Sequence, residues 1–319
     1  MTDTLLRHGI ASTWNDNNEF EIWTKNALAH GFGKPYPAHQ AKVLQTLIMM
    51  RASRDAQRAY APDFSIHSWN DDGTVNEPWM HPEATRQVAD LIKLRYRLLP
   101  YLYHLLWEST QHYDPVLRPT FAEFPQDPRC YVDGDDLMLG ASLLFAPVVE
   151  PGQTEREVWL PAGARWVSYW SGEAFAGDQR VVQPAPWDQP VMLLREGSVI
   201  PLNVAQQHFA RPADSRGFMV APHQGSGIAR GECFEDDGES QAWRSGEYGC
   251  WTVSVASDAA TLAVSVDWTG QWRRPFDSIE IFIPAADARH VVTANATIRE
   301  QTRVEGWTRL ILALAGSAA

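Results

Sequence analysis

Two carboxyl side chains near the start of the chain have the types and spacing best suited to covalent chemistry. Asp16 and Glu19 lie in the run Trp14-Asn15-Asp16-Asn17-Asn18-Glu19. An ionised carboxylate attacks an electrophilic carbon when neighbouring groups hold it in line with that carbon. The same composition also suits a solvated turn, and Glu19 also suits the first turn of a helix, where the dipole favours an acid. Composition alone leaves these interpretations open.

One histidine and three further carboxyls follow in the same part of the chain. His67 comes after a short apolar run, where it can donate a hydrogen bond to a ligand hydroxyl or serve a structural role. Asp71 and Asp72 belong to an Asn-Asp-Asp-Gly turn signal, whose side chains usually bond to their own backbone. Glu77 has no spacing that relates it to the others. No second catalytic carboxyl is predicted among these residues.

Two acidic runs occur later in the chain. Glu235-Asp236-Asp237-Gly238-Glu239 lacks the alternating ligands of an EF-hand loop, so we predict a tight turn between strands. Asp133, Asp135 and Asp136 are predicted to be surface turn residues. The ten histidines form no HExxH-like pair, so no metal site is expected.

Composition places the chain among globular proteins and excludes some partners. It has 319 residues, of which 45% are hydrophobic and 21% charged, and this length suggests two or three domains. A formal net charge of -12 argues against nucleic acid as a partner. The chain has fourteen tryptophans, whose rings can stack on sugar rings, but the cores of large β-sheet proteins are also rich in tryptophan.

The cysteines and the N-terminus indicate a compartment. Cys130, Cys233 and Cys250 are few, odd in number and show no CxxC spacing, as is typical of reduced thiols in a cytoplasmic protein. No signal peptide is visible, and no window approaches the length of a membrane span. We therefore expect a cytoplasmic location without a membrane partner.

The chain changes character near residue 115. Before it, apolar residues at helical spacing predict helices over Gln40–Tyr60 and Glu83–Gln111, and Pro100 is expected to kink or split the second. After it, short β-rich runs with Gly, Pro and Asp between them predict antiparallel sandwiches. Residues 206–226 are a plausible boundary between two such domains. The predicted strands are 137–139, 143–149, 157–161, 165–170, 181–182, 191–194, 250–256, 261–268, 278–283 and 308–314.

Several motifs occur in the order found in one enzyme family. Trp14–Glu19 resembles the nucleophile motif of family 31 glycoside hydrolases, the α-glucosidase and α-xylosidase family. Phe64–Trp69 is similar to the end of that family's last barrel strand, and Leu94–Tyr103 to a hallmark of its final helix. Leu139–Val148 and Phe234–Ser240 resemble segments of its C-terminal sandwiches.

The resemblance implies roles for four residues. Asp16 would be the nucleophile of a retaining mechanism and Glu19 its supporting carboxylate, while Trp14 and His67 would contact the sugar. The family's acid/base lies on a Trp-x-Gly-Asp-Asn-like segment, and no such string occurs in the printed sequence. The implied substrate is an α-glucoside or oligosaccharide, and the mechanism needs no cofactor and no metal.

The resemblance also implies an incomplete α+β multidomain fold. Residues 1–115 would be a mainly helical remnant of a (β/α) barrel, with an internal deletion near Asp63-Phe64. Residues 116–205 and 206–319 would form a proximal and a distal antiparallel β-sandwich. Because most barrel strands are absent, we expect poor order before about residue 75, uncovered apolar surface, and association as an oligomer or with a complementing fragment. A non-catalytic derivative, whose sandwiches serve as a structural or weak carbohydrate-binding module, is the alternative.

Overall fold

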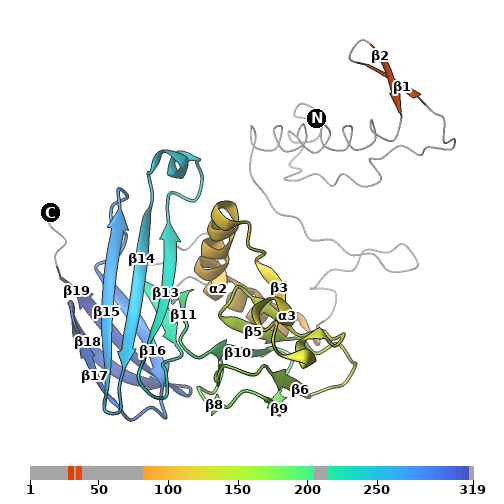
Figure 1. Ribbon diagram of the computed structural model, residues 1–319. Coiled ribbons are helices and arrows are strands. Elements are labelled where there is room, and N and C mark those ends of the chain that lie inside the picture. Colours follow the sequence, from red (N-terminus) through yellow and green to blue (C-terminus); the bar gives the residue numbers. More distant parts are fainter. Residues whose placement is uncertain (1–27, 32–33, 38–81, 205–214, 316–319) are drawn as a thin grey trace. The chain divides into compact units, whose positions relative to one another are not determined.

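The computed structural model describes residues 28–31, 34–37, 82–204 and 215–315 (Figure 1). The chain divides into two compact units, residues 1–81 and residues 82–319. In the first unit, the strands β1 (Leu28–Gly31) and β2 (Lys34–Pro37) pair antiparallel, with Leu28 opposite Pro37. The helix predicted over 40–60 and the expectation of poor order before residue 75 fall on residues that are almost all outside the described ones.

A single long helix opens the second unit. Helix α2 (Thr85–His112) has 28 residues and runs without interruption through Pro100. Of the two expected effects of this proline, a kink or a split of the helix, the split is therefore wrong. Proline lacks the N–H that would bond to the carbonyl four residues earlier, here that of Tyr96. The side chain of Asn203 supplies the missing donor, because its Nδ2 lies 2.9 Å from the Tyr96 carbonyl oxygen.

This replacement of a helix hydrogen bond by a side chain can be tested by a double-mutant cycle. Asn203→Ala removes the donor, and we expect it to lower the free energy of unfolding by about 1 to 3 kcal/mol, because the partly buried Tyr96 carbonyl is left unpaired. In a Pro100→Ala background the restored N–H pairs with Tyr96, so the same change should cost about 1 kcal/mol less. Urea unfolding measures both. Leu99→Ala is the control background, where Asn203→Ala should keep its full cost; equal costs with and without Pro100 would contradict the assignment.

The chain from 117 to 195 forms a six-stranded sheet and a separate two-stranded ribbon. The sheet has the order β3-β4-β5-β10-β7-β8, and β6 pairs with β9. Short helices α3 (Thr120–Glu123) and η3 (Pro128–Tyr131) follow β3. The strands are β3 (Leu117–Pro119), β4 (Leu137–Leu139), β5 (Leu143–Ala146), β6 (Glu155–Leu160), β7 (Trp166–Ser168), β8 (Ala174–Phe175), β9 (Gln179–Pro184) and β10 (Val191–Arg195).

The rest of the chain forms two further sheets. A five-stranded sheet has the order β11-β12-β16-β19-β18, and a four-stranded sheet has the order β13-β14-β15-β17. A 3-10 helix, η4 (Ala242–Ser245), lies between β13 and β14. The strands are β11 (Val199–Asn203), β12 (Arg216–Val220), β13 (Gly227–Glu235), β14 (Gly249–Ser257), β15 (Thr261–Gly270), β16 (Ser278–Pro284), β17 (His290–Thr293), β18 (Ala296–Val304) and β19 (Trp307–Leu314).

Three apolar clusters hold these layers together. In β10, Val191 and Leu193 join a cluster with the β6–β9 ribbon, whereas Met192 and Leu194 join a cluster with α2 and the five-stranded sheet. Successive strand residues point to opposite faces, so a strand buried on both faces is apolar throughout. The third cluster lies between the five- and four-stranded sheets, with Trp251 fully buried in it.

The described chain is thus mostly β-sheet with few helices. All ten strands predicted after residue 115 are present, with ends shifted by no more than three residues. Residues 206–226 were predicted as a boundary between two domains. They include the buried strand β12, which pairs with β11 and β16 in the five-stranded sheet. The three cysteines are free thiols; Cys130 and Cys233 are buried and Cys250 is partly buried.

Candidate functional site

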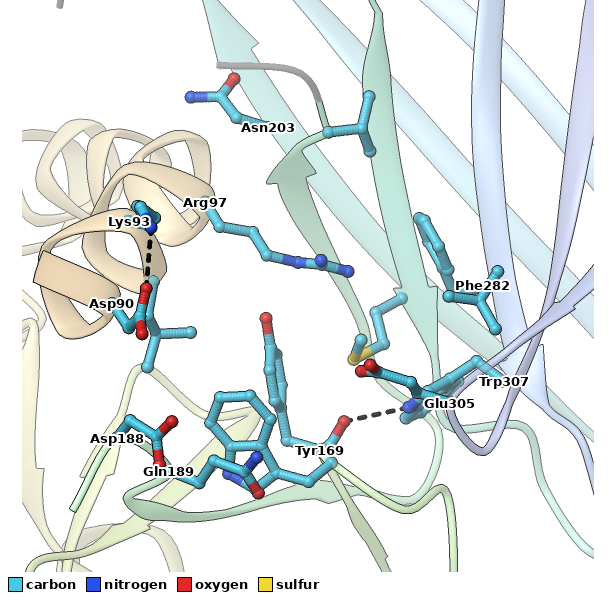
Figure 2. Close-up of a pocket in the computed structure, with 15 residues that line it drawn as sticks. Asp90, Lys93, Arg97, Tyr169, Asp188, Gln189, Asn203, Phe282, Glu305 and Trp307 are labelled. Carbon is cyan, nitrogen blue, oxygen red and sulfur yellow. Dashed lines mark hydrogen bonds and ion pairs between the residues drawn. The ribbon is translucent and has the colours of Figure 1, made fainter. Parts of the chain in front are cut away.

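The residues predicted for catalysis and substrate binding lie outside the described part of the chain. This holds for Asp16, Glu19, Trp14 and His67, and also for Asp71, Asp72 and Glu77. Their roles therefore stay predictions. The described residues form a different candidate site, a pocket of about 330 Å³ beside the N-terminal half of α2 (Figure 2).

Three parts of the second unit build the walls of this pocket. Helix α2 contributes Asp90, Lys93 and Arg97, whose spacing of three and four residues places them on one face. Tyr169 and Trp170 follow β7, and Asp188 and Gln189 precede β10. The five-stranded sheet supplies the remaining polar and aromatic lining residues, Asn203, Phe282, Glu305 and Trp307.

Hydrogen bonds hold the aromatic walls in place. The indole Nε1 of Trp307 donates to the carbonyl of Tyr169 at 2.9 Å, and that of Trp170 donates to the carbonyl of Pro190 at 2.8 Å. Trp307 and Tyr169 are buried in the cluster shared by α2 and the two sheets. Because the bonded indoles cannot turn without losing these donors, the walls are fixed before any ligand arrives.

Several polar groups of the pocket have no partner among the described residues. The Nε of Arg97 and the hydroxyl of Tyr169 are buried and make no hydrogen bond there. Figure 2 shows Arg97 reaching from α2 towards Phe282, with the Tyr169 hydroxyl pointing towards its side chain. Burial raises the pKa of Tyr169, and the Arg97 guanidinium offsets only part of this, so the phenol keeps its proton.

A second polar cluster involves the acidic run that was predicted as a tight turn. Asp236 Oδ1 accepts from the Gly238 N–H at 2.9 Å and Asp237 Oδ1 from the Glu239 N–H at 3.0 Å, so these side chains do bond to nearby backbone. The chain nevertheless continues through η4 before β14 begins at Gly249. The prediction of a tight turn between strands is therefore wrong, because the acidic residues open a longer loop.

This loop is fastened to α2 through Tyr103. Its hydroxyl donates to Asp236 Oδ1 at 2.8 Å, and burial together with this carboxylate raises the pKa of Tyr103. Trp107 stacks on Phe234 with ring centroids 5.1 Å apart. These contacts join the helix to the four-stranded sheet and give the acidic loop a packing role.

Asp136 also differs from a simple surface turn residue. Its carboxylate is half-buried and accepts from Arg156 Nη2 at 2.7 Å, while Asp133 and Asp135 are exposed as predicted. Burial raises the pKa of Asp136, and the neighbouring Arg156 opposes that rise. In the described residues no three His, Cys, Asp or Glu side chains gather as metal ligands. Among the helices described, none combines the length and apolarity needed to cross a membrane.

The pocket was missed at the level of sequence because its residues are far apart. Arg97 lies in the Leu94–Tyr103 segment, which draws attention only through the family resemblance. The high tryptophan count was the one compositional signal that applies to Trp170 and Trp307. Nothing in the spacing joins these positions, since three separate parts of the unit must fold before they meet.

Comparison with known proteins gives two adjacent matches to family models. Residues 57–105 match the glycosyl hydrolases family 31 TIM-barrel domain, and residues 113–200 match the glycosyl hydrolase family 31 C-terminal domain. An alpha-glucosidase 2 of Bacillus thermoamyloliquefaciens is 34% identical over 173 residues, 54% of this chain and 22% of that protein. An alpha-glucosidase of Saccharolobus solfataricus is 40% identical over 132 residues, 41% of this chain and 18% of that protein.

Solved structures agree with these matches. A family 31 dextranase of Flavobacterium johnsoniae, complexed with isomaltotriose, has a similar fold, with a TM-score of 0.64 at 20% identity. The likeness covers 74% of this chain and 32% of that one. A family 31 alpha-xylosidase of Xanthomonas citri has a TM-score of 0.51 at 28% identity, over 60% of this chain and 21% of that one.

The chain thus spans less than a third of the length of these relatives. Its matches begin within the barrel domain and continue through the C-terminal domain in the same order along the chain. Residues 57–200 therefore match two successive domains of glycosyl hydrolase family 31, its TIM-barrel domain and its C-terminal domain.

Proposed function

We propose that this chain is a glycoside hydrolase of the retaining α-glucosidase type, acting on terminal α-glucosidic bonds with Asp16 as nucleophile. The matches to two family 31 domains, together with the Trp14–Glu19 run, carry the proposal. Glu19 would support the nucleophile, and Trp14 and His67 would contact the sugar. The relatives named alpha-glucosidases and the dextranase complex with isomaltotriose support an α-glucoside or oligosaccharide as substrate.

The proposed reaction begins with attack of the Asp16 carboxylate on the anomeric carbon. A bond forms between that carbon and the carboxylate oxygen, and the glycosidic oxygen leaves with the bonding electron pair. In a retaining enzyme a second carboxyl protonates this oxygen and later activates the water that releases the sugar. The printed sequence contains no Trp-x-Gly-Asp-Asn-like segment to supply it. We therefore expect impaired turnover of substrates whose leaving group needs a proton.

The domain arrangement is part of the same proposal. Residues 1–115 would be a partial (β/α) barrel remnant with a deletion near Asp63-Phe64. Residues 116–205 and 206–319 would be the proximal and distal β-sandwiches. The family-model matches over 57–105 and 113–200 support this division. The three free thiols support a cytoplasmic location, which fractionation of the source cells would test.

A non-catalytic role is the second candidate, and two observations favour it. The unit of residues 82–319 has its own apolar clusters, so its sheets hold together as a module. Helix α2 also keeps Ile92, Leu99 and Leu106 exposed at seven-residue spacing, with 47%, 37% and 55% of their surface accessible. An apolar stripe of this kind suits a covering partner, either a second copy or a complementing fragment.

The deciding experiment compares this chain with Asp16→Asn on an aryl α-glucoside that has a good leaving group. Such a group departs with little help from an acid, so the assay isolates the nucleophile from its missing partner. We expect phenol release by the chain and none by Asp16→Asn, with Asp71→Asn as a control that keeps activity. No difference between the chain and Asp16→Asn would favour the non-catalytic module. Activity that appears only with an added barrel fragment would favour complementation.

A further inference from the structure

Another pocket of the unit of residues 82–319 lies beside two turns that touch each other. It has a volume of about 520 Å³ and is lined by the β7–β8 turn, by β8, β9 and β10, and by the β18–β19 turn. The turns meet at two glycines, because a Cβ added to Gly172 would lie only 2.3 Å from the carbonyl oxygen of Gly306. Only glycine allows backbones to approach this closely, so the two turns are held against each other.

Each of these turns places a carboxylate at the pocket. Glu173 follows Gly172, Glu305 precedes Gly306, and both glutamates line the pocket with exposed side chains. Neither carboxylate makes a hydrogen bond or an ion pair with a described residue. No lysine, arginine or histidine is among the described residues that line the pocket. A cleft that carries charge of one sign concentrates ions of the other sign, so this pocket attracts cations.

A buried amide in the same pocket has a free acceptor. Gln183 on β9 has only 8% of its surface exposed, and its Nε2 donates to the Val182 carbonyl at 3.3 Å. Its Oε1 accepts no hydrogen bond from a described residue. Unlike the unpaired hydroxyl of Tyr169, this oxygen keeps contact with solvent, and it does so in the pocket that Gln183 lines. Buried polar groups are nearly always satisfied, so this acceptor calls for a donor from outside the protein.

Aromatic rings complete the walls of the pocket. Trp170 and Phe175 line it and are each half-buried, so part of each side chain stays accessible to a ligand. The indole Nε1 of Trp170 donates to the Pro190 carbonyl at 2.8 Å, which fixes the orientation of that ring. The face of an aromatic ring attracts an ammonium group and packs against the methylenes beside it.

We propose that this pocket binds an aliphatic diamine or polyamine. Its ammonium groups donate to Glu173, Glu305 and the Oε1 of Gln183, while its methylenes lie against Trp170 and Phe175. A primary ammonium has three donors and no acceptor, which matches two free carboxylates and a free amide oxygen. An anion would be repelled by the carboxylates. The site is independent of the proposed hydrolytic function, because all of its residues belong to the unit of residues 82–319.

Calorimetric titration of the full chain with 1,4-diaminobutane tests this site. We expect a dissociation constant on the order of millimolar for so small a ligand. The uncharged 1,4-butanediol, which has the same carbon chain, should not bind. Glu173→Gln and Glu305→Gln should each weaken diamine binding about tenfold, because each removes one charged partner of an ammonium group. Glu150→Gln is the matched control, since Glu150 is exposed, does not line the pocket and changes the net charge equally, and it should leave binding unchanged.

Two further variants separate the pocket from a general attraction of cations to an acidic chain. Phe175→Leu keeps an apolar side chain on β8 but removes the ring, and it should weaken diamine binding several-fold. Asp16→Asn should bind as the unchanged chain does. Absence of diamine binding would overturn the proposal, and so would a loss of affinity as large in Glu150→Gln as in the two pocket variants. Binding of calcium that depends on Glu173 and Glu305, without binding of the diamine, would assign the pocket to a metal ion instead.

Discussion

The rate of phenol release is expected to depend on the leaving group far more steeply for this chain than for a family member with both carboxyls. General acid catalysis contributes about 10² to 10⁴ in rate when the departing oxygen is basic. A dinitrophenyl α-glucoside needs little of this help, whereas a phenyl α-glucoside or maltose needs most of it. The ratio of their rates should therefore widen by about 10² to 10⁴ relative to a complete enzyme.

Azide provides the complementary arm of this experiment. The missing second carboxyl would also activate water, so a glucosyl–Asp16 ester would be released slowly. Azide is already anionic and needs no base; it forms a bond to the anomeric carbon while the ester oxygen of Asp16 leaves. We expect azide to raise turnover of the dinitrophenyl substrate and to yield glucosyl azide. Rates that are insensitive to both leaving group and azide would mean that another group supplies the proton.

Removal of one partner from the Arg216–Glu235 ion pair is expected to have the largest effect on stability. The Arg216 Nε lies 2.7 Å from Glu235 Oε1, its Nη2 lies 2.9 Å from Oε2, and its Nη1 donates to Asn203. The pair joins β12 of the five-stranded sheet to β13 of the four-stranded sheet. Burial lowers the pKa of Arg216, but the carboxylate of Glu235 more than compensates and raises it overall.

Glu235→Leu and Arg216→Met should each lower the free energy of unfolding by about 3 to 5 kcal/mol, because each leaves a buried charge without its partner. The double variant should recover most of this loss, since no unpaired charge remains. Arg180→Met is the control, because the Arg180–Glu157 pair is exposed and should contribute at most about 1 kcal/mol. Denaturant unfolding measures all four proteins. A double variant as unstable as the sum of the two single variants would contradict this account.

The strands that the sequence predicted are those with strong local signals. Val191–Leu194 is a short apolar run, and Cys250–Ala256 alternates between buried and partly exposed residues. The strand β11 was missed because Pro201 interrupts its pattern. Its position at the edge of the five-stranded sheet explains why a proline is tolerated there.

Helix α2 and the pocket beside it depend on contacts between distant residues, which local sequence patterns do not predict. The expected split at Pro100 ignored Asn203, a residue more than a hundred positions away that satisfies the Tyr96 carbonyl. Arg97, Tyr169 and Glu305 likewise meet only after the helix and two sheets have packed. The motif resemblance singled out Asp16 and His67 as candidate residues. It could not identify a pocket whose residues come from separate parts of the chain.

Mass spectrometry of the intact chain after brief exposure to a dinitrophenyl α-glucoside tests the central claim most directly. The account predicts a covalent hexosyl adduct, located by peptide mapping on Asp16, that accumulates because no acid/base speeds its hydrolysis. Asp16→Asn should carry no adduct. An unmodified chain under conditions where the dinitrophenyl substrate is saturating, or an adduct on another residue, would contradict the claim that this chain retains the nucleophile of a family 31 enzyme.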